Sequence, residues 1–268
     1  MNKRLANELT IIQSLRMHGQ LAVSSLATIL ALSEPTIRRY LDVLEQRGEV
    51  IRVHGGAMLA PEKEYSSYLF HREKASMPCE KYAIGLAAAQ DLNDGDRIFF
   101  DSGTTVLECG QSLQKRLENK EIDDIYIVTN SLAFGATFAQ NCPVLLTGGN
   151  IRADRMDLAG PVALENLERY NFSKAVLGAD AVSADGELAT TDEDTSLLAA
   201  AVLKRCSSVM ILVDSKKLGK KSFVPYTKMQ GNKFTLYTDD GADAEIVAEL
   251  RDLEINVNVV KVQKRKNN

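Results

Sequence analysis

The sequence predicts an α/β protein in which a small N-terminal domain of short helices and a β-ribbon precedes a larger, mostly parallel α/β domain. Before residue 60, three segments with helical spacing of apolar residues are followed by a stretch that alternates with a period of two. After residue 79, short apolar runs alternate with helical segments, as in parallel sheets covered on both faces. With 268 residues, of which 45% are apolar, the chain can bury a core in each domain.

The first domain is expected to contain three helices. Residues 3–17 carry leucine and isoleucine at helical spacing, and Ser24 can cap a second short helix. A third helix starts after Ser33, because its side-chain oxygen can accept backbone N–H groups and Pro35 in the first turn has no N–H to leave unpaired. The apolar side chains of this helix fall at i, i+4 and i+7 and form one buried stripe: Ile37, Leu41 and Leu44.

A two-stranded wing is predicted to follow the third helix. Residues 50–54 mix β-branched residues with Arg52 and His54 at alternate positions, and Gly55-Gly56 permits a tight reversal into residues 57–59. Three short helices and such a ribbon form a winged helix-turn-helix. In that arrangement the first two helices hold the third at a groove of DNA.

The outward face of the third helix and the wing are the candidate DNA-binding surface. Side chains of the helix can enter the major groove while Arg52 and His54 reach phosphates or the minor groove. Arg38 and Arg39 could instead be surface charges, but the cap, the apolar stripe and the His-Gly-Gly turn together favour DNA binding. Because the net charge is −4, the contact depends on a local basic patch. The predicted DNA-binding residues are Ser33, Thr36, Arg38, Arg39, Tyr40, Arg52, His54 and Gly55.

Composition and spacing argue against several other classes of protein. The four cysteines lie far apart and lack C-x-x-C spacing, and the histidines show no metal-ligand spacing with them, so we predict reduced thiols and no metal. Neither the phosphate-loop motif nor the dinucleotide-binding motif is present, and no cofactor is expected. The sequence has no leader pattern and no run of about 18 apolar residues, so we expect a cytoplasmic protein without a membrane partner.

The expected domain boundaries follow these changes in pattern. We predict a DNA-binding domain over residues 1–60, a linker that packs in part over 61–78, an α/β domain over 79–262 and a frayed tail over 263–268. In the larger domain the predicted strands are 97–100, 125–128, 144–146, 174–177, 209–213, 233–237 and 257–262. The predicted helices are 80–92, 106–117, one that runs to residue 140, 161–169, 192–204 and 242–253.

Polar loops follow several of these strands, and ligands of open α/β sheets collect beyond the carboxyl ends of strands. In the loop 101–105, Gly103 allows close approach, Thr104 and Thr105 can donate hydrogen bonds, and the next helix offers free N–H groups to an anion. A turn of small residues after a strand is also common in α/β proteins that bind no phosphate there. Lys217, in the loop 214–219, favours phosphate binding because a second loop then brings a cation to the same rim.

These motifs together resemble the DeoR family of bacterial transcription regulators over nearly the whole chain. The N-terminal signature is T-I-R-R-x-L-x-x-L-x-x-x-G followed by R-x-H-G-G-A, and D-S-G-T-T, T-N-S, G-G-x-x-R and D-S-K-K-L-G follow in order. Two departures are Tyr40, where the family usually has Asp, and Thr195-Ser196, where it commonly has Glu-Ala.

The resemblance implies an effector domain related to sugar-phosphate isomerases, which binds a phosphorylated sugar that alters operator binding. It places Ser102, Gly103, Thr104 and Thr105 at the phosphate, with Lys217 as the charge partner. Weaker candidates for contacts to the sugar hydroxyls, or for positioning, are Asp101, Asn130, Arg152, Asp180 and Asp192.

We therefore expect a DNA-binding regulator, a repressor of carbohydrate-metabolism genes, which acts as a homodimer or homotetramer because operator symmetry mirrors protein symmetry. The alternative is a sugar-phosphate isomerase-like enzyme with an appended DNA-binding domain. No lysine or arginine occurs between Lys174 and Lys204, so the cation that would stabilise an enediolate is missing locally, and we expect no catalytic residues.

Overall fold

The computed structural model describes residues 3–46, 49–53, 55–59 and 69–263. The chain forms two compact units that divide between residues 66 and 67, inside the segment predicted as a linker. His54, residues 60–68 of the linker region and residues 264–268 of the predicted tail lie outside the described residues.

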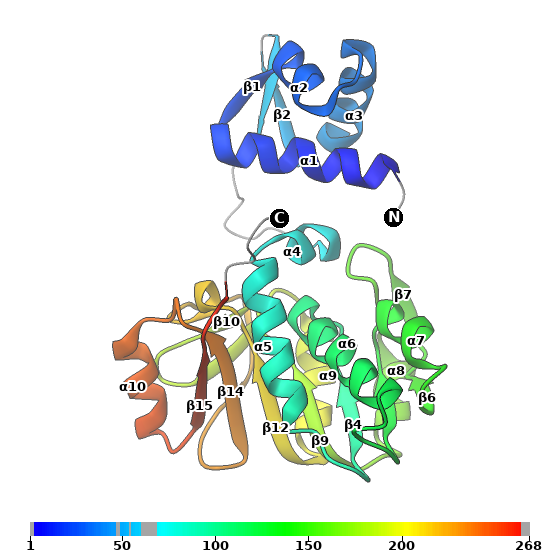
Figure 1. The fold of residues 1–268 in the computed structure, drawn as a ribbon. Coiled ribbons are helices and arrows are strands. Elements are labelled where there is room, and N and C mark those ends of the chain that lie inside the picture. The colour runs from blue at the N-terminus through cyan, green and yellow to red at the C-terminus, as the bar shows by residue number, and fades with distance from the viewer. Residues whose placement is uncertain (1–2, 47–48, 54, 60–68, 264–268) are drawn as a thin grey trace. The chain divides into compact units, whose positions relative to one another are not determined.

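The first unit is a winged helix-turn-helix (Figure 1). Its helices are α1 (Lys3–His18), α2 (Val23–Leu30) and α3 (Glu34–Gln46), and its strands are β1 (Gln20–Ala22), β2 (Val50–Val53) and β3 (Gly56–Leu59). The predicted stripe of α3 is buried in one hydrophobic cluster with residues of α1 and α2, which contains Ile11, Leu15, Leu26, Ile37, Leu41 and Leu44. The core therefore fixes which face of α3 is left to solvent.

The wing differs from the prediction because it has a third strand. The sheet order is β1-β3-β2, and β1 pairs antiparallel with β3, which places Leu21 opposite Ala57. A three-residue strand is too short to show alternation. Gly56 permits the pairing, since a Cβ at this position would lie 2.2 Å from the Leu21 carbonyl oxygen. The strand also sets the start of α2 at Val23, so that Ala22, not Ser24, is the N-cap residue.

The second unit is built on a parallel sheet with the strand order β15-β14-β12-β9-β4-β5-β6. The strands are β4 (Arg97–Phe100), β5 (Tyr126–Thr129), β6 (Val144–Leu146), β9 (Phe172–Leu177), β12 (Cys206–Leu212), β14 (Phe234–Asp239) and β15 (Asn256–Val260). Each corresponds to a predicted strand, with boundaries that differ by at most three residues.

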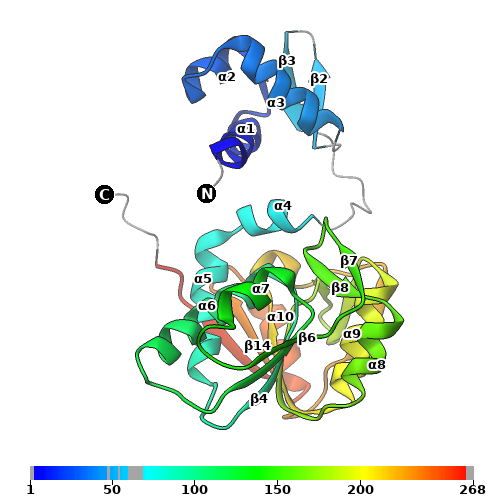
Figure 2. The same cartoon turned by 90° about the vertical axis from the view of Figure 1, so that its right-hand side faces the viewer.

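Helices cover both faces of this sheet (Figures 1 and 2). On one face lie α5 (Pro78–Gln90), α6 (Thr104–Glu118) and α7 (Leu132–Phe138), and on the other lie α8 (Pro161–Leu167), α9 (Glu193–Leu203) and α10 (Ala244–Asp252). Residues of β4 alternate between the two hydrophobic clusters, with Ile98 and Phe100 in one and Phe99 in the other. This burial on both faces explains why the strand reads as a continuous apolar run.

Several short elements of the second unit were not predicted. Helix α4 (Phe70–Ala75) lies inside the predicted linker, and a hairpin of β7 (Asn150–Arg152) and β8 (Asp157–Ala159) follows β6. A small antiparallel sheet has the order β10-β11-β13 and consists of β10 (Ala181–Val182), β11 (Glu187–Thr190) and β13 (Val224–Lys228). These elements are two to six residues long, which is too short for a periodic signal.

Among the helices that the structure describes, none is long and apolar enough to cross a membrane. The described residues also contain no group of three or more His, Cys, Asp or Glu side chains placed to hold a metal ion. All four cysteines are free; Cys109 and Cys206 are buried, while Cys79 and Cys142 are only partly so.

A buried lysine joins α4 to α5. Lys81 is 1% exposed, and its ammonium group donates a hydrogen bond to the carbonyl oxygen of Glu73 near the end of α4. Its Nζ also lies 4.0 Å from the Glu73 carboxylate. Burial, and next the nearby Lys217, lower the pKa of Lys81 from 10.5 to about 8, although Glu73, Asp214 and Glu108 act in the opposite direction.

We expect this lowered pKa to make stability depend on pH. Below about pH 8, Lys81 is charged in both the folded and the unfolded chain, and the folded chain carries the full cost of desolvation. Between pH 8 and pH 10.5 only the unfolded chain binds this proton, so stability rises. Relative to Lys81→Met, wild type should gain about 1 to 3 kcal/mol in free energy of unfolding between pH 7.5 and 10.5. Urea unfolding at each pH measures this difference. The exposed Lys216→Met is the matched control, and a pH-independent difference for Lys81→Met would contradict the expectation.

Candidate functional site

The exposed face of α3 carries most of the helix residues predicted to bind DNA. Ser33, Arg38 and Arg39 are exposed, and Thr36 is half-buried. The Ser33 hydroxyl lies 2.9 Å from the Thr36 hydroxyl, and the carbonyl of Ser33 accepts the first helical hydrogen bond, from the N–H of Ile37. Arg38 forms an exposed pair with Glu34 at 3.1 Å, one turn earlier. An exposed pair of this kind is weak and leaves the arginine free to take another partner.

Tyr40 does not share this face. It is half-buried against the hydrophobic cluster of the first unit, and its hydroxyl accepts a hydrogen bond from Nδ2 of Asn7, on α1, at 3.1 Å. Its side chain is therefore turned toward α1 rather than toward the face of Arg38 and Arg39. The structure gives Tyr40 a packing contact with α1, and its contact with DNA stays a prediction.

The two described wing residues, Arg52 and Gly55, each make a contact within the first unit. Arg52 is half-buried, and its guanidinium donates to the carboxylate of Asp42, which ties β2 to α3. Gly55 is exposed at the tip with φ of 76°, a left-handed conformation that glycine adopts without strain. The carbonyl of Gly55 accepts from the N–H of Val23 at the start of α2. The remaining predicted wing residue, His54, lies outside the described residues.

The second candidate site lies at the point of the parallel sheet where the order of successive strands reverses. From β4 the chain proceeds outward through β5 and β6, and then returns to β9 on the other side of β4 before it continues to β12, β14 and β15. The loops after β4 and β9 therefore diverge, which leaves a crevice at the carboxyl ends of these strands, the usual ligand position in open α/β sheets. At this point the backbones of Gly103 and Gly178 approach closely: a Cβ added to Gly103 would lie 3.7 Å from the Gly178 Cα.

A cavity at this crevice gathers seven of the ten residues predicted to bind the effector. They come from three separate loops and are Asp101, Ser102, Gly103, Thr104, Thr105, Asp180 and Lys217. Thr104 and Thr105 open α6 and are each 4% exposed, and the N-cap residue Gly103 supplies no side-chain cap. An uncapped helix start can bind an anion, because its first N–H groups have no partner within the helix and the helix dipole is positive at this end.

Lys217 approaches this helix start from the loop after β12. The loop forms a short 3-10 helix, η1 (Ser215–Lys217). The Lys217 ammonium donates to the carbonyl oxygen of Ala179 at 3.0 Å and lies 3.9 Å from the Asp180 carboxylate. The backbone of the loop after β9 therefore holds the cation at the cavity wall, as expected for a charge partner of a phosphate.

The other three predicted effector residues lie beside the cavity rather than in its lining. Asn130 is buried and its amide donates to the carbonyl of Leu158 at 3.5 Å. Asp192 is the N-cap of α9 and accepts from the backbone N–H of Thr195 at 2.9 Å. Arg152 is bound to carboxylates. Each of these three side chains contacts a neighbouring element, and their role toward an effector stays a prediction.

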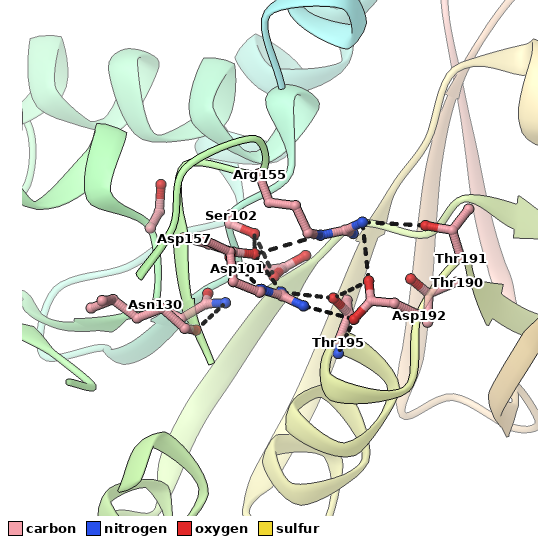
Figure 3. A network of polar contacts seen from close by, with 12 residues as sticks. Asp101, Ser102, Asn130, Arg155, Asp157, Thr190, Thr191, Asp192 and Thr195 are labelled. Atoms are coloured by element: carbon pink, nitrogen blue, oxygen red, sulfur yellow. Dashed lines mark hydrogen bonds and ion pairs between the residues drawn. The ribbon is translucent and has the colours of Figure 1, made fainter. Parts of the chain in front are cut away.

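A network of ion pairs joins Asp157 and Asp192 to nearby arginines (Figure 3). Asp157, fully buried on β8, receives a bidentate contact from Arg152 at 2.8 and 2.7 Å, and Arg152 also donates to Asp192 at 2.7 Å. The Ser102 hydroxyl donates to Asp157 at 3.1 Å. The network therefore joins the proposed phosphate loop to the β7–β8 hairpin and to the start of α9.

Sequence reasoning missed some residues that line the cavity. Arg155 lies in the turn of the unpredicted hairpin, Tyr226 on β13, Thr190 at the end of β11 and Thr195 in the first turn of α9. The hydroxyl of Tyr226 donates to the carbonyl of Gly178 at 3.0 Å. The sequence offered a signal for Arg155, which follows the G-G-x-x-R motif by three residues, and for Thr195, which departs from the family pattern. Tyr226 and Thr190 carry no local signal.

The carboxylates of the cavity differ in environment. Burial raises the pKa of Asp101, although hydrogen bonds from the Ser102 and Gly178 backbone act in the opposite direction. One carboxylate oxygen of Asp180 accepts from the Thr190 hydroxyl at 3.0 Å and from the N–H and hydroxyl of Thr191 at 2.9 and 3.1 Å. Asp180 thus fixes the end of β11. Burial also raises the pKa of Tyr226 well above its usual value, with Asp101 and Asp180 as further causes.

The cavity also corrects one argument against an enzyme. The sequence between Lys174 and Lys204 contains no cation, but Arg155 and Lys217 reach the cavity from other segments. A missing local cation therefore does not distinguish a sensor from an isomerase. The three donors to Asp180 all bind one carboxylate oxygen, Oδ2, and hold this side chain at the end of β11.

Comparison with known proteins identifies both units. The model of the DeoR-like helix-turn-helix domain matches residues 8–63, and that of the DeoR C terminal sensor domain matches residues 77–240. An uncharacterized HTH-type transcriptional regulator of Bacillus subtilis, YulB, is 31% identical over 95% of this chain and 96% of its own length. The glycerol-3-phosphate regulon repressor of Escherichia coli is 25% identical over 92% and 95%.

Among solved structures, ribose 5-phosphate isomerase A of Methanocaldococcus jannaschii is similar over 52% of this chain and 53% of that chain, with 19% identity and a TM-score of 0.40. At this level nothing about activity follows. The family models match most of each unit. The chain therefore belongs to the DeoR family of DNA-binding transcription regulators.

Proposed function

We propose that this protein is a repressor of carbohydrate-metabolism genes and that a phosphorylated sugar, bound at the cavity between the loops after β4, β9 and β12, controls its operator binding. The observation that carries the proposal is the start of α6, where buried Thr104 and Thr105 face the same cavity as Lys217 and Arg155. A helix N-terminus with two cations suits a phosphate better than a neutral sugar. A relative named for a glycerol-3-phosphate regulon supports a polyol or sugar phosphate as the ligand class.

A thermal-shift screen tests the ligand class directly. Sugar phosphates, the corresponding free sugars and inorganic phosphate are compared at equal ionic strength. A ligand at about 100 times its Kd adds about 2.7 kcal/mol to the stability of the protein. We expect one or more sugar phosphates to raise the Tm and their free sugars to have no effect. A panel without any phosphate-dependent shift would sink the proposal.

We also propose a cytoplasmic homodimer or homotetramer without catalytic activity. A helix-turn-helix protein that binds a symmetric operator places one recognition helix in each half-site, which supports an even number of subunits. Light scattering of the free protein gives the oligomer size, and a monomer that binds operator without self-association would contradict it. Incubation with the identified sugar phosphate, followed by product analysis, tests the absence of isomerase activity.

A further inference from the structure

Arg155 lies where the effector cavity meets the β7–β8 hairpin. It lines the cavity together with Ser102, Thr104 and Lys217. We propose, on the basis of the proposed effector site, that Arg155 is a further contact of the effector's phosphate and that it transmits binding to α4. This helix is the first helix of the second unit in the chain, so a signal that reaches it has arrived at the N-terminal end of that unit.

The arrangement of charges favours Arg155 over its neighbour Arg152 as the contact of the phosphate. Arg152 is held at 2.7 Å by both Asp157 and Asp192 and does not line the cavity. Arg155 makes longer contacts, at 3.0 Å to Asp192, 3.2 Å to the Thr191 hydroxyl and 3.8 Å to Asp157. The two arginines balance the two carboxylates. A phosphate in the cavity adds negative charge, which Arg155 can meet by exchanging its weaker contacts.

Ser102 provides a second link between a bound phosphate and the same hairpin. Its hydroxyl belongs to the proposed phosphate loop but donates to buried Asp157 at the start of β8. A phosphate that accepts this hydroxyl takes a donor away from Asp157 and places a like charge near it. Both effects act on the hairpin, because Asp157 and Arg152 are cross-strand partners in its register.

The turn of the hairpin contacts α4 directly. Arg155 and Met156 close the turn through hydrogen bonds to the carbonyls of Arg152 and Ala153 at 3.2 and 3.3 Å. In the middle of this turn, the carbonyl oxygen of Asp154 accepts the N–H of Phe70, the first residue of α4, at 2.8 Å. Since Asp154 and Arg155 are adjacent in one tight turn, a displacement of Arg155 toward a ligand moves the carbonyl that holds Phe70.

Helix α4 is also held along its length. Phe70 is 3% exposed in the hydrophobic cluster that includes residues of α5 and α6, and Lys81 donates to the carbonyl of Glu73 in the middle of the helix. Because α4 is only six residues long, a displacement at Phe70 is expected to reach the whole helix. Leu69 immediately precedes it, and the chain runs from there through residues 60–68 to the wing.

A matched pair of variants tests the contact between the turn and α4. Phe70→Pro removes both the ring and the N–H, whereas Phe70→Ala removes only the ring. Proline is tolerated at the first position of a helix, and Leu69 already has the extended conformation that a following proline requires, with φ of −118° and ψ of 110°. Both variants should bind the identified sugar phosphate with equal affinity. The effect of that ligand on operator affinity, typically about 5- to 150-fold in coupled systems, should persist in Phe70→Ala and fall to below about twofold in Phe70→Pro.

Arg155→Met tests the contact to the ligand. It should weaken effector binding about tenfold and also reduce coupling. Arg169→Met, which removes an exposed arginine paired with Glu165 one turn away, should change neither. Equal coupling in Phe70→Pro and Phe70→Ala, or unchanged effector affinity in Arg155→Met, would overturn the proposal.

Hydrogen exchange of the wild-type protein tests both phosphate binding and its transmission to α4, even if a variant does not fold. The probe is inorganic phosphate, compared with chloride at equal ionic strength. Protection of residues 101–106 together with a changed exchange rate of the Phe70 amide is the expected result. Protection of 101–106 with no change at Phe70 would overturn the transmission through α4 and leave the effector site standing. If neither segment responds, both the phosphate site and the inference that rests on it are withdrawn.

Discussion

Replacing Arg38 and Arg39 together by alanine should remove specific operator binding. Both side chains are exposed on the face of α3 that the buried stripe turns to solvent, and Arg38 has only a weak exposed pair with Glu34 to give up. Losing one base-contacting arginine costs about 1 to 3 kcal/mol, so each single variant should lose about 5- to 150-fold in affinity.

Fluorescence anisotropy on operator and on random duplex separates base contacts from phosphate contacts. Loss on the operator alone indicates base readout, whereas equal loss on both duplexes, with a salt slope reduced by about 0.9 for each lost contact, indicates phosphate contacts. Arg169→Ala, in the second unit, is the matched control for the change in net charge. A folded double variant that binds both duplexes as wild type does would show that α3 is not the recognition helix.

The sequence predicted the parallel sheet well because burial on both faces leaves a strong local signal. Residues 97–100 and 144–146 form strands with the predicted boundaries. In the first of them Ile98, Phe99 and Phe100 are all buried, because helices cover both faces of the sheet there. The same holds for α3, whose stripe repeats the spacing that helix geometry requires. In these segments local pattern and tertiary environment agree.

Elements stabilised by a few long-range contacts could not be predicted in this way. β1 is defined by its pairing with Gly56 and its neighbours more than thirty residues later, and the β7–β8 hairpin carries an ion pair to Asp192, the N-cap residue of α9. The residues that line the cavity likewise divide into those with a local sequence pattern and those without one. Ser102 to Thr105 lie in one recognisable loop, but Arg155 and Tyr226 come from elements that have no periodicity of their own. Their positions follow from the topology.

Substitution of Thr104 or Lys217 should weaken the response to the effector without affecting operator binding in its absence. Thr104→Val keeps the shape of a side chain that is 4% exposed and removes only its hydroxyl, and Lys217→Met removes the cation at the cavity wall. Each deletes charge-assisted hydrogen bonds worth roughly 1.5 to 3 kcal/mol, so effector affinity should fall about tenfold or more. The DNA-binding unit is not altered. Whether the effector releases or promotes operator binding, more of it is then needed for the same response.

The matched controls lie next to the altered residues. Lys216→Met removes an exposed cation from the same 3-10 turn and should leave the response unchanged, while Thr104→Ser retains a hydroxyl and should restore most of the affinity lost in Thr104→Val. The measurement is a titration of the operator complex with the identified sugar phosphate, repeated for each variant. Equal midpoints for wild type, Thr104→Val and Lys217→Met would place the phosphate elsewhere, because two donors on separate loops cannot both be lost from a phosphate site without a change in affinity.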